Sequence, residues 1–185
     1  MHNLNRRDFI SLALAAGSTA LVQPSAVLAA ERPGKHEICA FIKFLQSLSH
    51  DQLADTISEM GFDGIEATVR AKGYVLPERV EDELPKLVDA LKKRNLQITV
   101  MTTDVNRVDQ PLTPKVLKTA AALGVKRYRM GAYRYDLDRP VEAQLAELKP
   151  MLADLAALNR ELGLTGVYQN HSGATNVGAP VWDIY

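Results

Sequence analysis

Residues 58–69 read SEMGFDGIEATV, and this stretch contains the pattern that decides the fold. A helical segment ends at Gly61, a short link follows, and a strand-like run begins near residue 64. The same pattern returns in KKRNLQITVMTT (92–103), AALGVKRYRMGA (121–132) and RELGLTGVYQNH (160–171). Repeated alternation of helix and strand signals predicts successive βα units, which build a parallel sheet.

Four turn residues separate the helices from the strands. Glycine and asparagine tolerate the left-handed conformation just past a helix end better than other residues do. The four are Gly61, Asn95, Gly124 and Gly163. We therefore expect strands near residues 37–43, 64–69, 97–103, 126–132 and 165–170, with four helices between them.

Two helices are indicated by apolar residues at steps of three or four. Residues 141–162 keep mostly this spacing and predict a long amphipathic helix. In SHDQLADTISEMG (49–61), Ser49 is the predicted N-cap because its hydroxyl can accept from a backbone N–H of the first turn.

The two helices between them contain prolines. Thr113 is the predicted N-cap of one, with Pro114 at its first helical position. The other lies near 82–94, and we expect Pro85 in its first turn, since a proline inside a helix removes a hydrogen bond.

The expected fold class is α/β, a partial (β/α)₈ TIM barrel of about four and a half βα units. A complete barrel of this kind needs about 250 residues, and the chain has 185. We therefore expect the chain to be C-terminally truncated. The alternative is a complete five-stranded doubly wound sheet, which would normally end on a covering helix. The final residues, APVWDIY (179–185), are too few for that helix.

Composition and missing motifs exclude several functions. The chain has 22 basic and 22 acidic residues, and no dense basic stretch that would indicate a nucleic-acid partner. It has no GxGxxG after a strand, no GxxxxGK, no HExxH and no GxSxG. A nucleotide-dependent enzyme or a serine hydrolase is therefore disfavoured.

The N-terminus has the three parts of a secretory signal. NRRDFI (5–10) carries paired arginines, an apolar stretch follows, and the small-residue segment AVLAA (26–30) ends it. The twin arginine indicates the Tat export machinery as a partner, and the apolar run is short of the roughly 20 residues of a membrane span. We predict a signal peptide over 1–29, a barrel domain over 30–185, and a periplasmic or otherwise exported protein with no membrane association after signal removal.

Polar residues at the strand ends are the candidate site, because ligands bind at the carboxyl ends of parallel strands. Glu66 lies inside an apolar strand, where a charge is costly unless paired, so it is either functional or bridged to an arginine such as Arg129. His171 lies in a polar cluster after the fifth strand and is also a functional candidate. The candidates for substrate binding are Arg70, Asp104, Arg129, Tyr133, Gln169 and Asn170.

The sequence resembles the sugar phosphate isomerase/epimerase superfamily, the xylose isomerase-like TIM barrels, and among them the exported Tat-dependent bacterial members. The segments that carry the resemblance are NRRDFI (5–10), GFDGIEATVR (61–70), KRNLQIT (93–99) and YQNHSGATNVGAPVWDIY (168–185). The resemblance implies a sugar isomerase or epimerase that moves a proton through an ene-diolate. Glu66 and His171 are then the acid–base candidates, and Arg70, Gln169 and Asn170 contact substrate hydroxyls.

The resemblance also implies a divalent metal, Mn²⁺, Mg²⁺ or Zn²⁺, which polarises the sugar oxygens. His171 is the candidate ligand in this chain, and the other ligands are expected beyond Tyr185. Gln169 stands where related epimerases often carry a glutamate, and an amide cannot act as a base. We expect the complete protein to be the enzyme and the 185-residue chain alone to be inactive.

Two other functions stay open: a lyase or hydrolase of oxidised keto sugars, and a non-catalytic periplasmic carbohydrate-binding protein. In each case the partner is a small sugar, and a free sugar or glycoside is expected rather than a sugar phosphate. A half-barrel exposes two unpaired sheet edges, so we also expect self-association, including a homo-oligomer.

Overall fold

The structure is a computed structural model that describes residues 36–185. Residues Glu37–Tyr185 form one compact unit, which contains the fold. The predicted signal peptide over 1–29 lies outside the described residues. Among the residues that are described, no helix is both long enough and apolar enough to span a bilayer.

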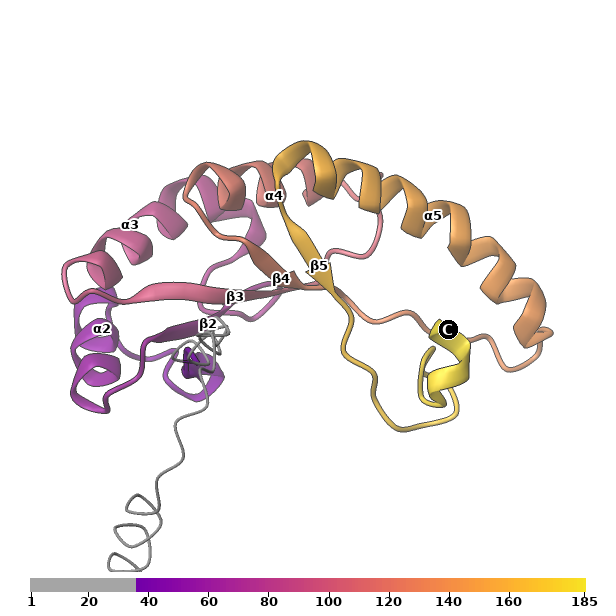
Figure 1. Ribbon diagram of the computed structural model, residues 1–185, viewed down its shortest axis with the longest axis horizontal. Helices are drawn as coiled ribbons and strands as arrows, with labels where there is room; N and C mark the ends of the chain where they lie inside the picture. Colours follow the sequence, from indigo (N-terminus) through magenta and orange to yellow (C-terminus); the bar gives the residue numbers. More distant parts are fainter. Residues whose placement is uncertain (1–35) are drawn as a thin grey trace, which may run out of the picture. The chain divides into compact units, whose positions relative to one another are not determined.

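Five parallel strands form one sheet in sequential order (Figure 1). They are β1 (Cys39–Phe41), β2 (Gly64–Val69), β3 (Gln97–Thr103), β4 (Arg127–Arg129) and β5 (Thr165–Val167). β2 and β3 have the limits expected from the sequence. β1, β4 and β5 are shorter, with three residues each, and β4 pairs with β5 over those three residues.

The strand order excludes the doubly wound alternative. In such a sheet the order reverses at a switch point, as in 2-1-3-4-5. Here each strand pairs in parallel with the next one in the sequence, from β1 through β5. Sequential parallel pairing is the order found in a (β/α)₈ barrel wall.

One helix follows each of the first four strands. These are α2 (His50–Glu59), α3 (Val80–Lys92), α4 (Thr113–Ala122) and α5 (Val141–Leu162), with short 3₁₀ helices η1 (Ile42–Phe44), η2 (Pro77–Arg79) and η3 (Val181–Ile184). The predicted limits of α5 are confirmed. All four predicted turn residues, Gly61, Asn95, Gly124 and Gly163, have positive φ.

The predicted cap of α2 is confirmed as a capping box. The Ser49 hydroxyl accepts a 3.3 Å hydrogen bond from the Gln52 amide, and the Gln52 side chain accepts one of 3.0 Å from the Ser49 amide. Two N–H groups that the helix leaves unpaired are thereby satisfied.

Two predictions about helix starts are wrong. Thr113 is the first residue of α4 and not its cap; its hydroxyl donates to the Gln110 side chain at 3.2 Å. α3 begins at Val80, so Pro85 is its sixth residue and lies past the first turn. The earlier start places three acidic residues in the first turn of α3, where the helix dipole favours them.

The main core lies between the helices and one face of the sheet. Ile65, Ala67 and Val69 alternate along β2 and are almost fully buried. They pack in one cluster with residues of the four helices, among them Leu53, Leu84, Leu117 and Leu155. A second, smaller cluster joins Tyr133, Tyr135 and Val177 to the N-terminal half of α5.

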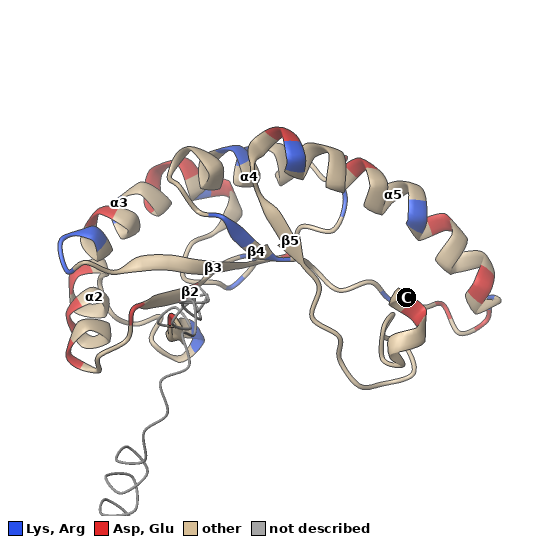
Figure 2. Cartoon of the chain, viewed as in Figure 1, with Lys and Arg blue, Asp and Glu red and all other residues tan. Residues whose placement is uncertain are grey.

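The other face of the sheet, here called the inner face, is not covered by these helices (Figure 1). Because side chains alternate along a strand, Glu66 and Thr68 of β2 point away from the helix-packed residues. Acidic and basic residues are spread along the helices, whereas the strands carry few (Figure 2). Glu66, Arg127 and Arg129 are the only charged residues within the five strands.

Candidate functional site

Glu66 is held in place by the two strands that follow its own. The hydroxyl of Thr102, on β3, donates to Oε1 of Glu66. Nη1 of Arg129, on β4, lies 3.4 Å from the same oxygen. The Glu66 side chain is 22% exposed and that of Arg129 is 20% exposed, so both reach solvent on the inner face. Of the two alternatives for Glu66, a functional role or a bridge to an arginine, the structure shows the bridge to Arg129, and the functional role stays a prediction.

Arg129 joins Glu66 to residues of the first and fifth strands. Its Nη1 donates a 2.6 Å hydrogen bond to Oε1 of Gln169, just after β5. Its guanidinium carbon lies 5.5 Å from the centre of the Phe41 ring, on β1. The inner-face cluster, as it is called below, consists of Phe41, Glu66, Thr102, Arg129 and Gln169. The first four lie on β1 to β4, and Gln169 lies two residues after the end of β5.

The cluster offers both a proton acceptor and hydrogen-bond donors. Oε2 of Glu66 has no hydrogen-bond partner among residues 36–185, so one carboxylate oxygen is left to a ligand. The guanidinium beside it donates only, and Gln169 can donate through its amide nitrogen. A base next to fixed donors is the arrangement needed to remove a proton beside a carbonyl and stabilise the resulting oxyanion.

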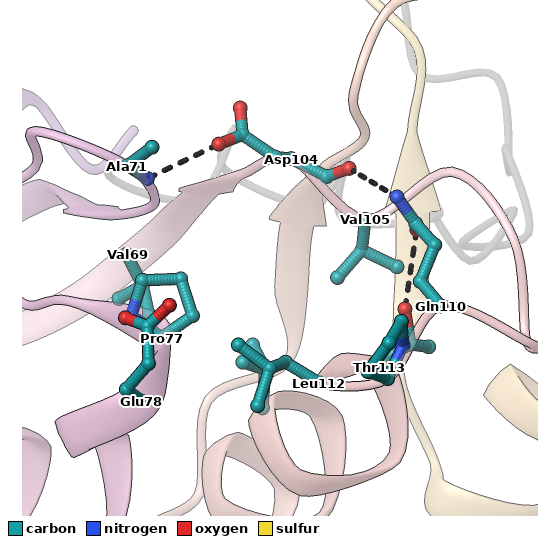
Figure 3. Close-up of a pocket in the computed structure, with 11 residues that line it drawn as sticks. Val69, Ala71, Pro77, Glu78, Asp104, Val105, Gln110, Leu112 and Thr113 are labelled. Carbon is teal, nitrogen blue, oxygen red and sulfur yellow. Dashed lines mark hydrogen bonds between the residues drawn. The ribbon is translucent and has the colours of Figure 1, made fainter.

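Asp104 is not part of the inner-face cluster and lies in the loop that follows β3. Its carboxylate accepts a 3.1 Å hydrogen bond from the Ala71 amide, and its carbonyl accepts from the Gln110 side chain at 3.3 Å. The first bond ties the loop after β2 to the loop after β3, and the second lies within the loop after β3 (Figure 3). Below them is a cavity of about 300 Å³ with mainly apolar walls, including Val69, Pro77 and Leu112.

Tyr133 belongs to the second core cluster. Its side chain is buried, its hydroxyl donates to the Asn106 carbonyl, and its ring stacks on Tyr168 at 5.9 Å between centroids. Burial raises the pKa of Tyr133 to about 12. Its hydroxyl is thus engaged in packing two loops together, and the structure does not bring it to the inner-face cluster.

The remaining predicted residues lie at the rim. Arg70 follows β2, is half-buried and has no side-chain hydrogen bond or ion pair within the described part of the chain. Asn170 and His171 follow β5 and are exposed, and neither side chain has a partner among residues 36–185. Their roles stay predictions.

Two cluster residues, Thr102 and Phe41, were given no role from the sequence. Thr102 was visible as a strand-end threonine, and its parity relative to Glu66 could have identified it. Phe41 gave no such signal, since an aromatic residue in a strand normally indicates core packing.

The described residues do not by themselves fit a divalent metal. Such an ion needs several oxygen or nitrogen ligands close together, and residues 36–185 contain no group of three or more His, Cys, Asp or Glu that could hold one. Glu66 is the only carboxylate in the cluster, and the positive Arg129 guanidinium lies beside it. A divalent metal site would need further ligands that are not among residues 36–185.

The chain matches no protein-family model and no curated protein. Its structure is similar to that of 3-keto-D-glucoside 4-epimerase from E. coli, with a TM-score of 0.59 and 15% identity over 76% of this chain and 58% of that one. It is also similar to the IOLI protein with a zinc atom bound, with a TM-score of 0.52 and 18% identity over 72% and 51%. A xylose isomerase-like TIM barrel protein from Mycobacterium smegmatis in complex with magnesium matches with a TM-score of 0.50 and 14% identity over 75% and 56%.

The chain spans between 51% and 58% of the length of these three proteins. At such low identity the likeness shows the fold alone. Together with the sequential parallel sheet, it confirms an α/β fold that corresponds to part of a xylose isomerase-like TIM barrel.

Proposed function

We propose that this chain is part of an isomerase- or epimerase-like enzyme that acts on a carbohydrate, with Glu66 moving the proton. The observation that carries the proposal is the Glu66 carboxylate, held by Thr102 and Arg129 on the uncovered inner face of a barrel-type sheet. The fold supports it, since a 3-keto-D-glucoside 4-epimerase has a similar structure.

The residues of the cluster divide the chemistry between them. Glu66 takes a proton from the carbon beside a sugar carbonyl through its free Oε2, while the Thr102 hydroxyl fixes the other oxygen. Negative charge then develops on the carbonyl oxygen, to which the Gln169 amide nitrogen donates, and the positive charge of Arg129 lies beside it. Protonation of that carbon from its other face by a second acid gives an epimer. Protonation of the former carbonyl carbon, while the hydroxyl proton of the first carbon moves to the oxyanion, gives an isomer.

A divalent metal stays a proposal from the resemblance. The zinc and magnesium in two proteins of similar fold support it. His171 is our candidate ligand or second acid–base group, because its imidazole is exposed and has no partner among the described residues. No step above depends on a metal.

Export through the Tat route is proposed from the sequence alone, on residues 5–10 and 26–30. Replacing both Arg6 and Arg7 by lysine should retain the protein in the cytoplasm. Fractionation of cells that express the wild type and the double variant tests this, and equal periplasmic yields would contradict it.

The proton transfer is tested by deuterium exchange. The protein encoded by the complete gene is incubated in D₂O with ketoses and 3-keto glycosides, and deuterium at the carbon beside the carbonyl is followed by NMR. Glu66→Gln should lower the exchange rate by about a hundredfold or more. Glu161→Gln, which removes an exposed carboxylate at the end of α5, should leave it unchanged.

Two results would overturn the proposal. Absence of exchange with every substrate excludes isomerase chemistry and favours a binding protein. Full activity of Glu66→Gln excludes Glu66 as the base, whatever the reaction.

A further inference from the structure

Most of the donors of Arg129 are not used within the described chain. A guanidinium has five N–H groups in a fixed fork. Only Nη1 has protein partners, Oε1 of Gln169 at 2.6 Å and Oε1 of Glu66 at 3.4 Å. Nε and Nη2 have no hydrogen-bond partner among residues 36–185, although four-fifths of the side chain is buried. One complete edge of the guanidinium is therefore available to a ligand.

A second guanidinium lies on the same face. Arg127 is two residues before Arg129 on β4, so the two side chains point to the same side of the sheet. Tyr128 between them points the other way, is fully buried and donates to the Asn159 side chain of α5 at 3.0 Å. Arg127 is exposed and has no ion-pair partner within the described residues. β4 is accordingly the basic strand of the sheet (Figure 2).

The charges on the inner face do not balance. Of the three charged residues in the five strands, two are arginines and one is Glu66. The strand residues therefore leave one net positive charge. The unpaired edge of Arg129 offers an anion on this face two N–H donors side by side.

We propose that the inner face recognises a sugar that carries a carboxylate, such as a uronic acid, and that Nε and Nη2 of Arg129 hold the carboxylate side-on. A planar carboxylate matches the fork with two parallel hydrogen bonds. Its single charge matches the single net positive charge of the face. This assignment rests on the proposed function, since it places the sugar at the same cluster.

A phosphorylated sugar shares the oxyanion chemistry but fits the charges less well. A phosphate monoester carries nearly two negative charges at neutral pH. Glu66 lies 3.4 Å from the Arg129 guanidinium, so a dianion bound there would also approach the Glu66 carboxylate. The carboxylate is therefore the anion that this face favours.

The test compares three matched ligands. D-galacturonate, D-galactose and D-galactose 6-phosphate are titrated into the protein encoded by the complete gene, and binding is measured by calorimetry at low salt. D-galacturonate should bind about tenfold or more tightly than D-galactose, the range of charge-assisted hydrogen bonds. Equal affinities for D-galacturonate and D-galactose would overturn the proposal. Tightest binding of D-galactose 6-phosphate would also overturn it, and would show that the face recognises a sugar phosphate.

Variants locate the effect. Arg129→Lys keeps the charge but loses the fork, and should remove most of the preference for D-galacturonate. Arg160→Gln removes an exposed charge from the last turn of α5 and should keep that preference. An unchanged preference in Arg129→Lys would show that Arg129 does not hold the carboxylate. The comparison of ligands on the wild type stands even where a variant does not fold.

The outcome is separable from that of the exchange experiment. Preferential binding of D-galacturonate without deuterium exchange keeps the carboxylate site and rejects the enzyme. Exchange on neutral keto sugars with no preference for the acid keeps the enzyme and rejects the carboxylate site.

Discussion

The guanidinium carbon of Arg129, on the fourth strand, lies 5.5 Å from the centre of the Phe41 ring on the first. Neighbouring strands are about 4.8 Å apart, so these two strands would be roughly 14 Å apart in a flat sheet. The contact indicates that the sheet curls toward its inner face, as a barrel wall does. The same curvature brings side chains from all five strands into one cluster.

Replacing Phe41 tests this contact. Phe41→Leu removes the ring on which the Arg129 guanidinium rests and should lower the free energy of unfolding by about 1 kcal/mol. The Arg129 side chain should also become more mobile, which ¹⁵N relaxation of its Nε–H group can detect. Phe44→Leu is the control, because that side chain is 75% exposed. Equal behaviour of the two variants would show that the ring does not position Arg129.

Thr102 should act by positioning Glu66. Thr102→Val removes the hydroxyl that donates to Oε1 of Glu66 without changing the volume much, and should lower kcat for proton exchange by about tenfold while KM stays nearly constant. Thr102→Ser restores a hydroxyl and should recover most of the rate. Thr119→Val, which removes a hydroxyl that donates within α4, controls for the loss of any threonine. Failure of serine to recover the rate would point to a packing role.

Stability should fall at high pH because of Tyr133. Burial raises the pKa of this hydroxyl to about 12 in the folded chain, against 10.0 in its absence. The folded state thus holds the proton more tightly than the unfolded state. The contribution of Tyr133 to the free energy of unfolding is complete below pH 10 and is lost as the pH rises toward 12. Urea unfolding between pH 8 and 11 measures the decline, and Tyr133→Phe should make it less steep. A parallel decline in wild type and variant would assign it to other groups, such as Tyr74, whose pKa is also raised to about 12.

The chain should self-associate through α5 and the residues that follow β5. Leu152 of α5 is 40% exposed and Trp182 is 80% exposed, and both line a groove of about 610 Å³. The sheet also ends on unpaired β1 and β5 within the described residues, and open edges favour pairing between chains. Light scattering across a concentration series should show oligomers, and Leu152→Lys should reduce them. A monomer at all concentrations would contradict this prediction.

Local features were predictable from the sequence. The limits of β2 and β3, the span of α5, the Ser49 cap and the four positive-φ turns depend on neighbours a few residues away, so pattern and residue type suffice. The starts of α3 and α4 were less predictable, because alternative first residues of a helix differ little in free energy.

The site was predictable in part. Glu66, Arg129 and Gln169 could be named because strand ends in a parallel sheet gather at one edge, and a charge inside an apolar strand needs a partner. Tyr133 and Asp104 satisfied the same rule of position, yet one packs a second core and the other joins two loops. The place of a residue at the end of a strand does not determine the path of the loop that follows, and so does not determine which groups its side chain contacts.

The sequence by itself determined the order of strands and helices, the local caps and turns, and the face of the sheet to which Glu66 and Arg129 belong, since all of these follow from the periodicity of the backbone. Only the tertiary structure decided that Phe41 and Thr102 complete the cluster and that Arg129 keeps one edge of its guanidinium unpaired. Those contacts join residues as far apart as 41 and 169, and their distances depend on how strongly the sheet curls, a property of all five strands packed together.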